Sequence, residues 1–278
     1  MCKVSIITAS YNYAHYLEEA INSVINQTFT DWELLVVDDG SKDNSLDVIK
    51  NFVQRDHRIK LHTHENCVNK GLRETLKLGI ANAKGQYIAF LESDDYWHPD
   101  NLAVKVSILD KNPQVGIVDD AVKLVGNERL FGRYDEYWNL RQQKFNNKIF
   151  PADIFHDLFV ENLIPTFSCA VCRADILKKC NFEYFYTPHL DRSLWLQICK
   201  KEYYYHVPDF LTFWRIHGDS YISSEDKSYR KSFIKKVYAL LMPCYAGGLV
   251  NPLLHWAVIR FIFTNLWRSI KQRTGKKQ

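Results

Sequence analysis

Three carboxylates stand close together directly after an apolar run that ends at Leu91. They belong to Glu92, Asp94 and Asp95. Like charges at this spacing repel one another, and keeping them ionised beside a buried strand costs free energy. Mg²⁺ or Mn²⁺ removes that cost, because such a cation takes oxygen ligands and commonly shares them with a substrate phosphate. The cluster therefore predicts either a metal–phosphate site or, as the alternative, a solvated acidic turn before the next helix.

Length and composition are typical of a globular protein of one large domain or two small ones. The chain has 278 residues, of which 46% are hydrophobic and 24% charged, enough for a sizeable core. A net charge of +4 predicts no general polyanion-binding surface, and we expect no nucleic-acid partner. No export signal follows Lys3, and the seven cysteines are scattered. We therefore expect reduced thiols and a cytoplasmic location.

Two hydrophobic periodicities alternate through residues 1–125. Strands are predicted over residues 4–8, 32–37, 58–62, 86–91 and from 115, and helices over 14–27, from 44 or 45, 71–82 and 99–111. Strands that alternate with helices form right-handed crossovers, which predicts an α/β fold with a mostly parallel central sheet flanked by helices. After about residue 126 this order is lost. We expect a loop or lid over 134–150, a helix over 190–199 and a strand over 206–213.

Polar clusters follow three of the predicted strands, at residues 8–12, 38–43 and 92–95. Ligands of such sheets bind outside the carboxyl ends of the strands, so we expect the three clusters to share one crevice. No Gly-x-Gly-x-x-Gly follows the first strand, and no P-loop is present. Dinucleotide oxidoreductases and P-loop enzymes therefore find no support in the sequence.

The ordered motifs are similar to those of the inverting family 2 glycosyltransferases with the GT-A fold, especially bacterial enzymes that build surface polysaccharides. They read VSIITASYN, VDDGSKD, AKGQYIAFLESDD, DRSLWL and WRIH, starting at residues 4, 37, 83, 191 and 214. The resemblance covers about residues 3–220. It implies metal-dependent transfer of a sugar from a nucleoside diphosphate donor to a saccharide or lipid-linked hydroxyl. It also implies a catalytic domain over 1–225, with a nucleotide-sugar half to 125 and an acceptor half from 126.

On the donor side, the resemblance implies that Thr8 and Ala9 line the base pocket through backbone contacts. Tyr11 would stack on the base, with an aromatic of the core at a helix start as the alternative. Asp39 would accept the imide N–H of uracil or thymine, which favours a UDP or dTDP donor. Asp38 is more consistent with a structural role.

For the metal, the resemblance implies that Asp95 ligates Mn²⁺ or Mg²⁺ and that Asp94 contacts the ribose, or the metal through water. His217 would be a further metal ligand or a phosphate contact, or else an ordinary hydrogen-bonded loop histidine. Glu92 departs from the commoner Asp of the family. Arg215 would contact the diphosphate or pair with a local carboxylate.

The catalytic base implied by the resemblance is Asp191, which would take the proton from the acceptor hydroxyl. Its alternative role is to cap the helix that follows. The family often carries Ala-Arg-Asn where this chain has Thr75-Leu76-Lys77. The missing cation would be replaced near the phosphates by Lys70, Arg73 or Lys77, and the sequence leaves the choice open.

Residues 226–278 predict a basic helical tail. From Lys227 onward there are eleven Lys or Arg and no Asp or Glu. A helix from about residue 253 would carry Trp and Phe on one face and Arg and Lys on the other, a pattern of helices that lie on an anionic membrane surface. We therefore expect peripheral attachment to the cytoplasmic face of the membrane. Docking on the catalytic domain or a partner chain is the alternative.

Two rival functions accompany the glycosyltransferase interpretation. A catalytically silent nucleotide-sugar-binding protein would keep the fold as a scaffold or regulatory partner. A nucleotidyltransferase of related architecture would need a Gly-rich, basic loop after the first strand, and residues 8–12 do not provide one. The presence of all four predicted aspartates of the site favours the enzyme.

Overall fold

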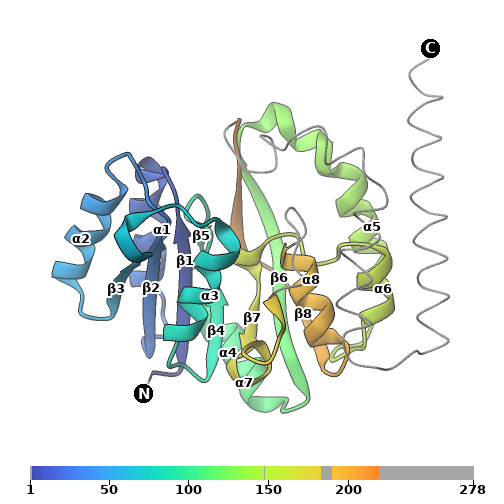
Figure 1. The fold of residues 1–278 in the computed structure, drawn as a ribbon. Coiled ribbons are helices and arrows are strands. Elements are labelled where there is room, and N and C mark those ends of the chain that lie inside the picture. Colours follow the sequence, from blue (N-terminus) through green and yellow to red (C-terminus); the bar gives the residue numbers. More distant parts are fainter. Residues whose placement is uncertain (1, 147, 183–189, 219–278) are drawn as a thin grey trace.

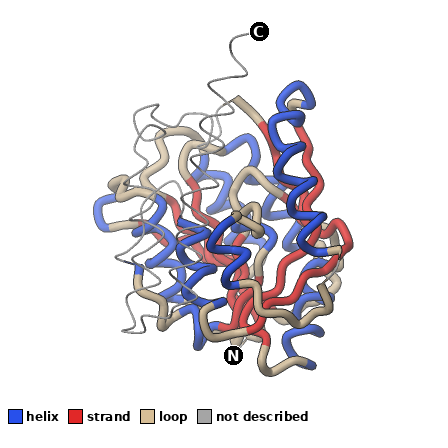
Figure 2. The backbone as a smooth tube through the Cα atoms, turned by 90° about the vertical axis from the view of Figure 1, so that its right-hand side faces the viewer, coloured by secondary structure: helices blue, strands red, loops and turns tan. Residues whose placement is uncertain are grey.

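A computed structural model describes residues 2–146, 148–182 and 190–218. Within them, one eight-stranded sheet has the order β3-β2-β1-β4-β7-β6-β8-β5 (Figure 1). The strands are β1 (Val4–Ser10), β2 (Trp32–Asp38), β3 (Ile59–Thr63), β4 (Tyr87–Phe90), β5 (Tyr96–Trp97), β6 (Val115–Gly126), β7 (Val171–Arg173) and β8 (Tyr203–Ile216). Figure 2 shows these strands running together through the molecule between the helices.

The sheet is parallel on its N-terminal side and mixed beyond it. Strands β3, β2, β1 and β4 pair in parallel. Strand β7 runs antiparallel to both β4 and β6, whereas β6 and β8 are again parallel. The α/β fold is confirmed. From β4 onward the sheet contains antiparallel pairs that the alternation of elements did not predict. The sequence does not reveal them, because β7 and β5 are too short to show a hydrophobic periodicity.

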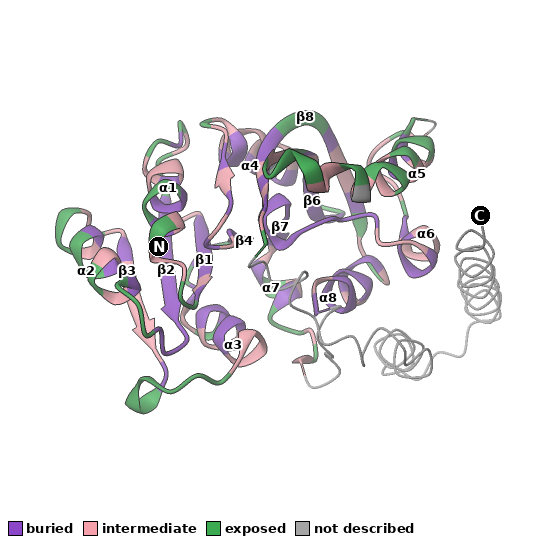
Figure 3. Ribbon diagram, turned by 90° about the horizontal axis from the view of Figure 1, so that it is seen from above, coloured by how far each residue is buried: buried purple, intermediate pink, exposed green. Residues whose placement is uncertain are grey.

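Two helical layers cover the two faces of the sheet. Helices α1 (Ala14–Ile25), α2 (Ser45–Arg55) and α4 (Asn101–Lys111) pack on one face. Helices α3 (Leu72–Asn82), α6 (Phe155–Val160), α7 (Ala174–Leu177) and α8 (Leu190–Cys199) pack on the other. Every residue of β2 is buried, as expected for a strand covered on both faces. Figure 3 shows the buried strands between these two layers.

The prediction of a loop over 134–150 is wrong, because α5 (Asp135–Phe145) is helical, and the alternative of a lid stays a prediction. Its first turn follows the short 3₁₀ helix η2 (Glu128–Tyr134). Only Arg141 and Phe145 of α5 are buried. The Arg141 guanidinium donates to Asp119 over 2.8 Å and to the Leu163 carbonyl over 2.7 Å. The helix is thus held by a buried ion pair, which hydrophobic spacing does not reveal.

The boundary that we predicted at residue 125 falls at the end of β6. This strand pairs with β8 from Val115 to Gly126, so residues before and after the boundary share one sheet. The division into a donor half and an acceptor half stays a prediction. The predicted tail over 226–278 lies outside the described residues. Among the residues that are described, no helix is long and apolar enough to cross a membrane.

A buried lysine ties α4 to β6 and to the segment before β7. Lys105 is 0% exposed, and its ammonium lies 2.5 Å from the Asp120 carboxylate and 2.9 Å from the Cys169 carbonyl oxygen. Burial raises the pKa of Asp120 even with this cation beside it. Removing the cation leaves the buried Asp120 carboxylate with hydrogen bonds from Thr212 and the Leu211 N–H but without the positive charge beside it.

We therefore expect Lys105→Met to lower the free energy of unfolding by about 3–5 kcal/mol, measured by urea denaturation. Lys111→Met is the matched control, because Lys111 ends the same helix but is exposed. Its expected change is within about 0.5 kcal/mol. Equal losses in both variants would contradict a specific role for the buried pair.

Candidate active site

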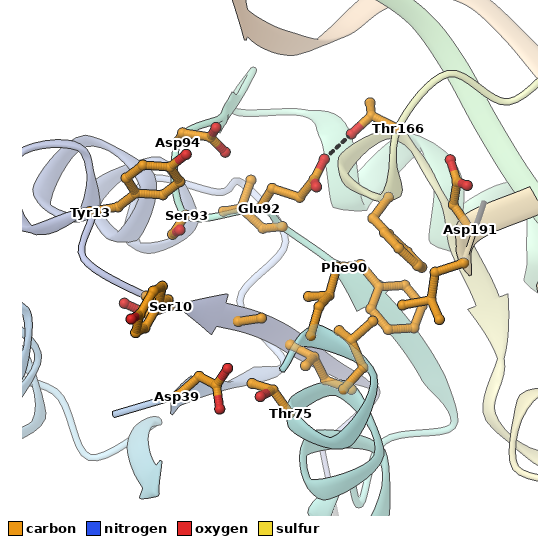
Figure 4. A pocket seen from close by; sticks show the side chains of 18 of the residues that line it. Ser10, Tyr13, Asp39, Thr75, Phe90, Glu92, Ser93, Asp94, Thr166 and Asp191 are labelled. Atoms are coloured by element: carbon orange, nitrogen blue, oxygen red, sulfur yellow. Dashed lines mark hydrogen bonds between the residues drawn. The ribbon is translucent and has the colours of Figure 1, made fainter. Parts of the chain in front are cut away.

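A cavity of about 630 Å³ opens at the carboxyl ends of β1, β2 and β4. The polar clusters that follow these strands share it, as their positions predicted. Five of the predicted site residues line it: Ala9, Tyr11, Asp39, Asp94 and Asp191. Figure 4 shows Asp39, Asp94 and Asp191 at three separate places around this space. The other predicted residues (Thr8, Arg73, Lys77, Asp95 and His217) are not among those that line it.

Asp39 forms one end of the cavity and is held firmly. Its two carboxylate oxygens accept hydrogen bonds from the backbone N–H groups of Lys70 (2.7 Å) and Gly71 (2.9 Å). Gly40 beside it has φ +77°, and a Cβ there would lie 2.6 Å from the Cys67 carbonyl oxygen. Only glycine allows this close approach of the two loops. The Asp39 carboxylate therefore has a fixed position in the cavity wall.

The neighbouring Asp38 has the structural role that we predicted. It is fully buried, and its carboxylate accepts from the N–H groups of Gly40 and Ser41 and from the Ser41 hydroxyl. Tyr11 is 45% exposed, so its alternative role as a core aromatic is wrong. Thr8 is buried within β1, so that any contact with a ligand would come through its backbone.

The two aspartates of the acidic loop after β4 have different surroundings. Asp94 lines the cavity, and its Oδ2 lies 2.9 Å from Nε2 of His217. Asp95 is 1% exposed. Its Oδ2 accepts from the Ser168 hydroxyl (2.6 Å), and its Oδ1 accepts from the Arg215 N–H (2.9 Å). The geometry therefore favours Asp94, rather than the predicted Asp95, as the carboxylate that meets a ligand.

Glu92 extends from the same loop toward the opposite wall. Its carboxylate accepts a hydrogen bond from the Thr166 hydroxyl, as Figure 4 shows. Burial and the nearby Asp94 carboxylate raise the pKa of Glu92 to about 8. The longer side chain that replaces the commoner Asp thus reaches a partner on the segment before β7.

Asp191 lies in the first turn of α8, on the opposite side of the cavity from Asp94 in Figure 4. Its Oδ1 accepts from the N–H of Arg192 over 2.7 Å. The pKa of Asp191 is raised to about 6, because the effect of burial is larger than the opposing effects of this hydrogen bond and of the Arg192 charge. Apolar residues such as Phe90, Phe167 and Leu190 line the cavity as well. A carboxylate with this pKa is well suited to accept a proton near neutral pH.

The cavity wall is strongly acidic. Its lining residues include Asp39, Glu92, Asp94 and Asp191 but, among the described residues, no Lys, Arg or His. The predicted cations of α3, Arg73 and Lys77, instead lie 3.0 and 3.2 Å from the Glu74 carboxylate. Arg215 pairs with Glu19, which is the second of the two roles that we considered for it.

Asp94 and His217 fit one hard divalent cation. Adjacent ligand atoms around an octahedral ion with bonds of about 2.1 Å are separated by about 3.0 Å. Asp94 Oδ2 and His217 Nε2 are joined by a hydrogen bond of 2.9 Å, so a cation bound between them would displace the shared proton at almost the same separation. Within the described part of the chain, no three His, Cys, Asp or Glu side chains form a complete metal site. An ion held here would take its other ligands from water and from phosphate oxygens of a substrate.

Sequence reasoning missed Thr166, Phe167 and Ser168, the first two of which line the cavity. They lie in an irregular stretch that ends in the 3₁₀ helix η3 (Phe167–Cys169). No periodicity or motif marks this stretch. Trp214, also in the cavity wall, could have been found, because it opens one of the motifs on which the resemblance rests.

Comparisons with known proteins agree with the fold. Solved structures with the same fold include Staphylococcus aureus TarS in complex with UDP-GlcNAc, with a TM-score of 0.67 at 19% identity over 94% of this chain and 71% of that one. The mannosyltransferase PcManGT of Pyrobaculum calidifontis, in complex with GDP-Man and Mn²⁺, has a TM-score of 0.62 at 17% identity, covering 93% of this chain and 68% of that one. The fold is therefore GT-A.

A curated relative is the Escherichia coli UDP-Glc:alpha-D-GlcNAc-diphosphoundecaprenol beta-1,3-glucosyltransferase WfgD. It is 31% identical over 201 residues, which cover 71% of this chain and 70% of WfgD. Against another curated relative, the match spans only 39% of that protein's length. The model of the family described as "Glycosyl transferase family 2" matches residues 5–180. This chain belongs to glycosyl transferase family 2.

Proposed function

We propose that this protein is a metal-dependent inverting glycosyltransferase of bacterial surface-polysaccharide synthesis. It transfers a sugar from a UDP- or dTDP-linked donor to the hydroxyl of a saccharide or lipid-linked acceptor. The observation that carries the proposal is the arrangement of Asp39, Asp94 and Asp191 around one cavity at the strand ends. These three carboxylates supply a base-recognition group, a metal ligand and a proton acceptor.

The nucleoside of the donor binds at the Tyr11 end of the cavity. The exposed ring of Tyr11 offers a face on which a base can stack. Asp39 lies in the same wall and accepts the imide N–H of uracil or thymine. The backbone N–H groups of Lys70 and Gly71 each occupy one lone pair of an Asp39 oxygen. The imide N–H would use a second lone pair of one of these oxygens.

The donor's diphosphate lies near Asp94. An acidic cavity without a lysine or arginine among its described lining residues repels a diphosphate, unless a cation accompanies it. Asp94 and His217 would hold Mn²⁺ or Mg²⁺, which would neutralise the charge that develops on the leaving nucleoside diphosphate.

Asp191 acts as the general base. Its carboxylate takes the proton of the acceptor hydroxyl while that oxygen forms a bond to the anomeric carbon of the sugar. The bond from the anomeric carbon to the diphosphate oxygen breaks, and the nucleoside diphosphate leaves on the opposite face. A single displacement of this kind inverts the configuration at the anomeric carbon. The apolar residues of the cavity wall limit the access of water to this step.

The acceptor class rests on relatives. WfgD is named for a sugar acceptor that is linked through diphosphate to undecaprenol. A lipid-linked acceptor would suit an enzyme at the cytoplasmic face of the membrane, to which the basic tail over 226–278 would attach. Deletion of residues 250–278 should release such a protein from membrane fractions.

Calorimetric binding of UDP, dTDP and GDP, each with and without Mn²⁺, tests the donor assignment. We expect UDP or dTDP to bind only when Mn²⁺ is present. Binding of GDP alone would overturn the role of Asp39, and no binding of any nucleotide would contradict the donor site as a whole.

Calorimetric binding of UDP to Tyr11→Ala tests whether the base stacks on Tyr11. Loss of the stacking face should weaken UDP binding by about 1–3 kcal/mol. The midpoint of thermal unfolding should not change, since Tyr11 is 45% exposed. Tyr203→Ala is the control, because Tyr203 is 47% exposed and does not line the cavity. Equal effects of both variants would contradict stacking at Tyr11.

A further inference from the structure

Three segments that are far apart in the sequence meet behind the acidic wall of the cavity. They are residues 92–95, 166–168 and 215–217, and Ser168 joins the first two. Its hydroxyl donates to Asp95 Oδ2 over 2.6 Å and accepts from the N–H of Glu92 over 3.0 Å. One side chain thus fixes both ends of the loop that carries Asp94.

Asp95 and Arg215 connect this loop to the end of β8. The second oxygen of Asp95 accepts from the Arg215 backbone N–H over 2.9 Å. The Arg215 side chain donates in turn to the Asp94 carbonyl over 2.8 Å. His217 follows two residues later and reaches Asp94 from there. The positions of Asp94 and His217 are therefore set by one continuous chain of hydrogen bonds.

Neither Ser168 nor Asp95 belongs to the cavity wall. Ser168 is 0% exposed and Asp95 is 1% exposed, so both act through other residues. We propose that Ser168 and Asp95 are positioning residues, which hold the Asp94 carboxylate and the His217 imidazole at the separation that one divalent cation requires. The proposal rests on the function proposed above. It gives Asp95 a role in metal binding without making it a ligand.

The backbone of Ser168 is held independently of its hydroxyl. Its carbonyl oxygen accepts from the Trp97 indole N–H over 2.7 Å. Removal of the hydroxyl should therefore leave the segment in place and release only the Asp95 carboxylate and the Glu92 N–H. Groups that orient a metal ligand typically change metal affinity by about 10–100-fold when they are removed.

Mn²⁺ binding in the presence of UDP, followed by the electron paramagnetic resonance signal of free Mn²⁺, tests this role. We expect Ser168→Ala to weaken Mn²⁺ binding by about 10–100-fold. Ser193→Ala is the matched control, because Ser193 is equally buried and its hydroxyl has no hydrogen-bond partner among the described residues. It should bind Mn²⁺ as the wild type does.

Ser168→Cys provides a second variant with a side chain of similar size. A thiol is a weak donor, so the affinity for Mn²⁺ should fall here too, even where Ser168→Ala is too unstable to measure. Wild-type affinity in Ser168→Cys, or in a folded Ser168→Ala, would overturn the positioning role and leave the proposed function intact. Absence of Mn²⁺ binding by the wild type with UDP would overturn both.

Discussion

Asp191→Asn should abolish sugar transfer while the donor still binds. The amide that replaces the carboxylate keeps its shape but cannot take the proton of the acceptor hydroxyl, and loss of a general base lowers rates by about 10²–10⁴-fold. The side chain lies across the cavity from Asp94, so UDP binding with Mn²⁺ should be unchanged. Rates of transfer from a nucleotide sugar, together with calorimetric binding, measure both effects.

A surface carboxylate gives the control for this variant. Asp175 lies on α7 with its side chain 71% exposed, so Asp175→Asn should transfer sugar at the wild-type rate. Normal turnover of Asp191→Asn would mean that another group, such as Glu92, is the base. If Asp191→Asn lost both donor binding and turnover, Asp191 would instead have a role in the donor site. Binding without turnover in the wild type itself would favour the silent scaffold.

The pKa of Asp191 fixes the expected pH dependence of transfer. The base is active when it is ionised, and its pKa is raised to about 6 by burial. Transfer should therefore be constant above that pH and fall about tenfold per pH unit below it.

The same raised pKa has a consequence for stability. It exceeds the unfolded value of about 3.9, so ionisation of Asp191 destabilises the fold as the pH rises from about 4 to 6. Asp191→Asn should thus raise the midpoint of thermal unfolding near neutral pH and have little effect near pH 4. A lower midpoint at both pH values would instead mean that the carboxylate stabilises the start of α8.

The N-terminal half of the fold could be predicted from the sequence because its strands and helices carry their own hydrophobic periodicity. β1, β2 and α1 to α4 lie within a few residues of their expected bounds. The second half depends on contacts that periodicity does not encode. α5 is held by the buried Arg141, and β7 has three residues between longer strands. Three residues are too few to show a hydrophobic periodicity, so the sequence does not reveal how β7 pairs.

The candidate site divides in the same way. The positions of Asp39 and Asp94 at one cavity follow from the rule that parallel strands present their carboxyl ends together. Asp191 lies in the first turn of α8, and only the family resemblance placed it in the site. Which of two adjacent aspartates faces the cavity depends on the turn between β4 and β5 and on Ser168, which lies 73 residues away from Asp95. Likewise, Arg73 and Lys77 face Glu74 because of their places on α3. Neither orientation could be predicted from motifs alone.

These orientations lead to a second prediction of large effect. We expect Asp94→Asn to weaken the binding of Mn²⁺ with UDP by at least about a hundredfold, because removal of a ligand should cost more than removal of a group that orients one. Donor binding should then lose most of its dependence on the metal. Calorimetric titration of UDP into the variant, with and without Mn²⁺, measures the difference.

Asp95→Asn discriminates between the two carboxylates. The oxygen of an asparagine at this position can still accept from the Arg215 N–H. Its NH₂ group can donate to the Ser168 oxygen, which reverses the direction of the hydrogen bond that Ser168 donates to Asp95. Mn²⁺ affinity should therefore fall by less than about tenfold. If Asp95→Asn lost the metal and Asp94→Asn kept it, the original expectation from the sequence would be right. The loop would then have to turn over on binding its donor, because the Asp95 carboxylate is now fully engaged behind the cavity wall.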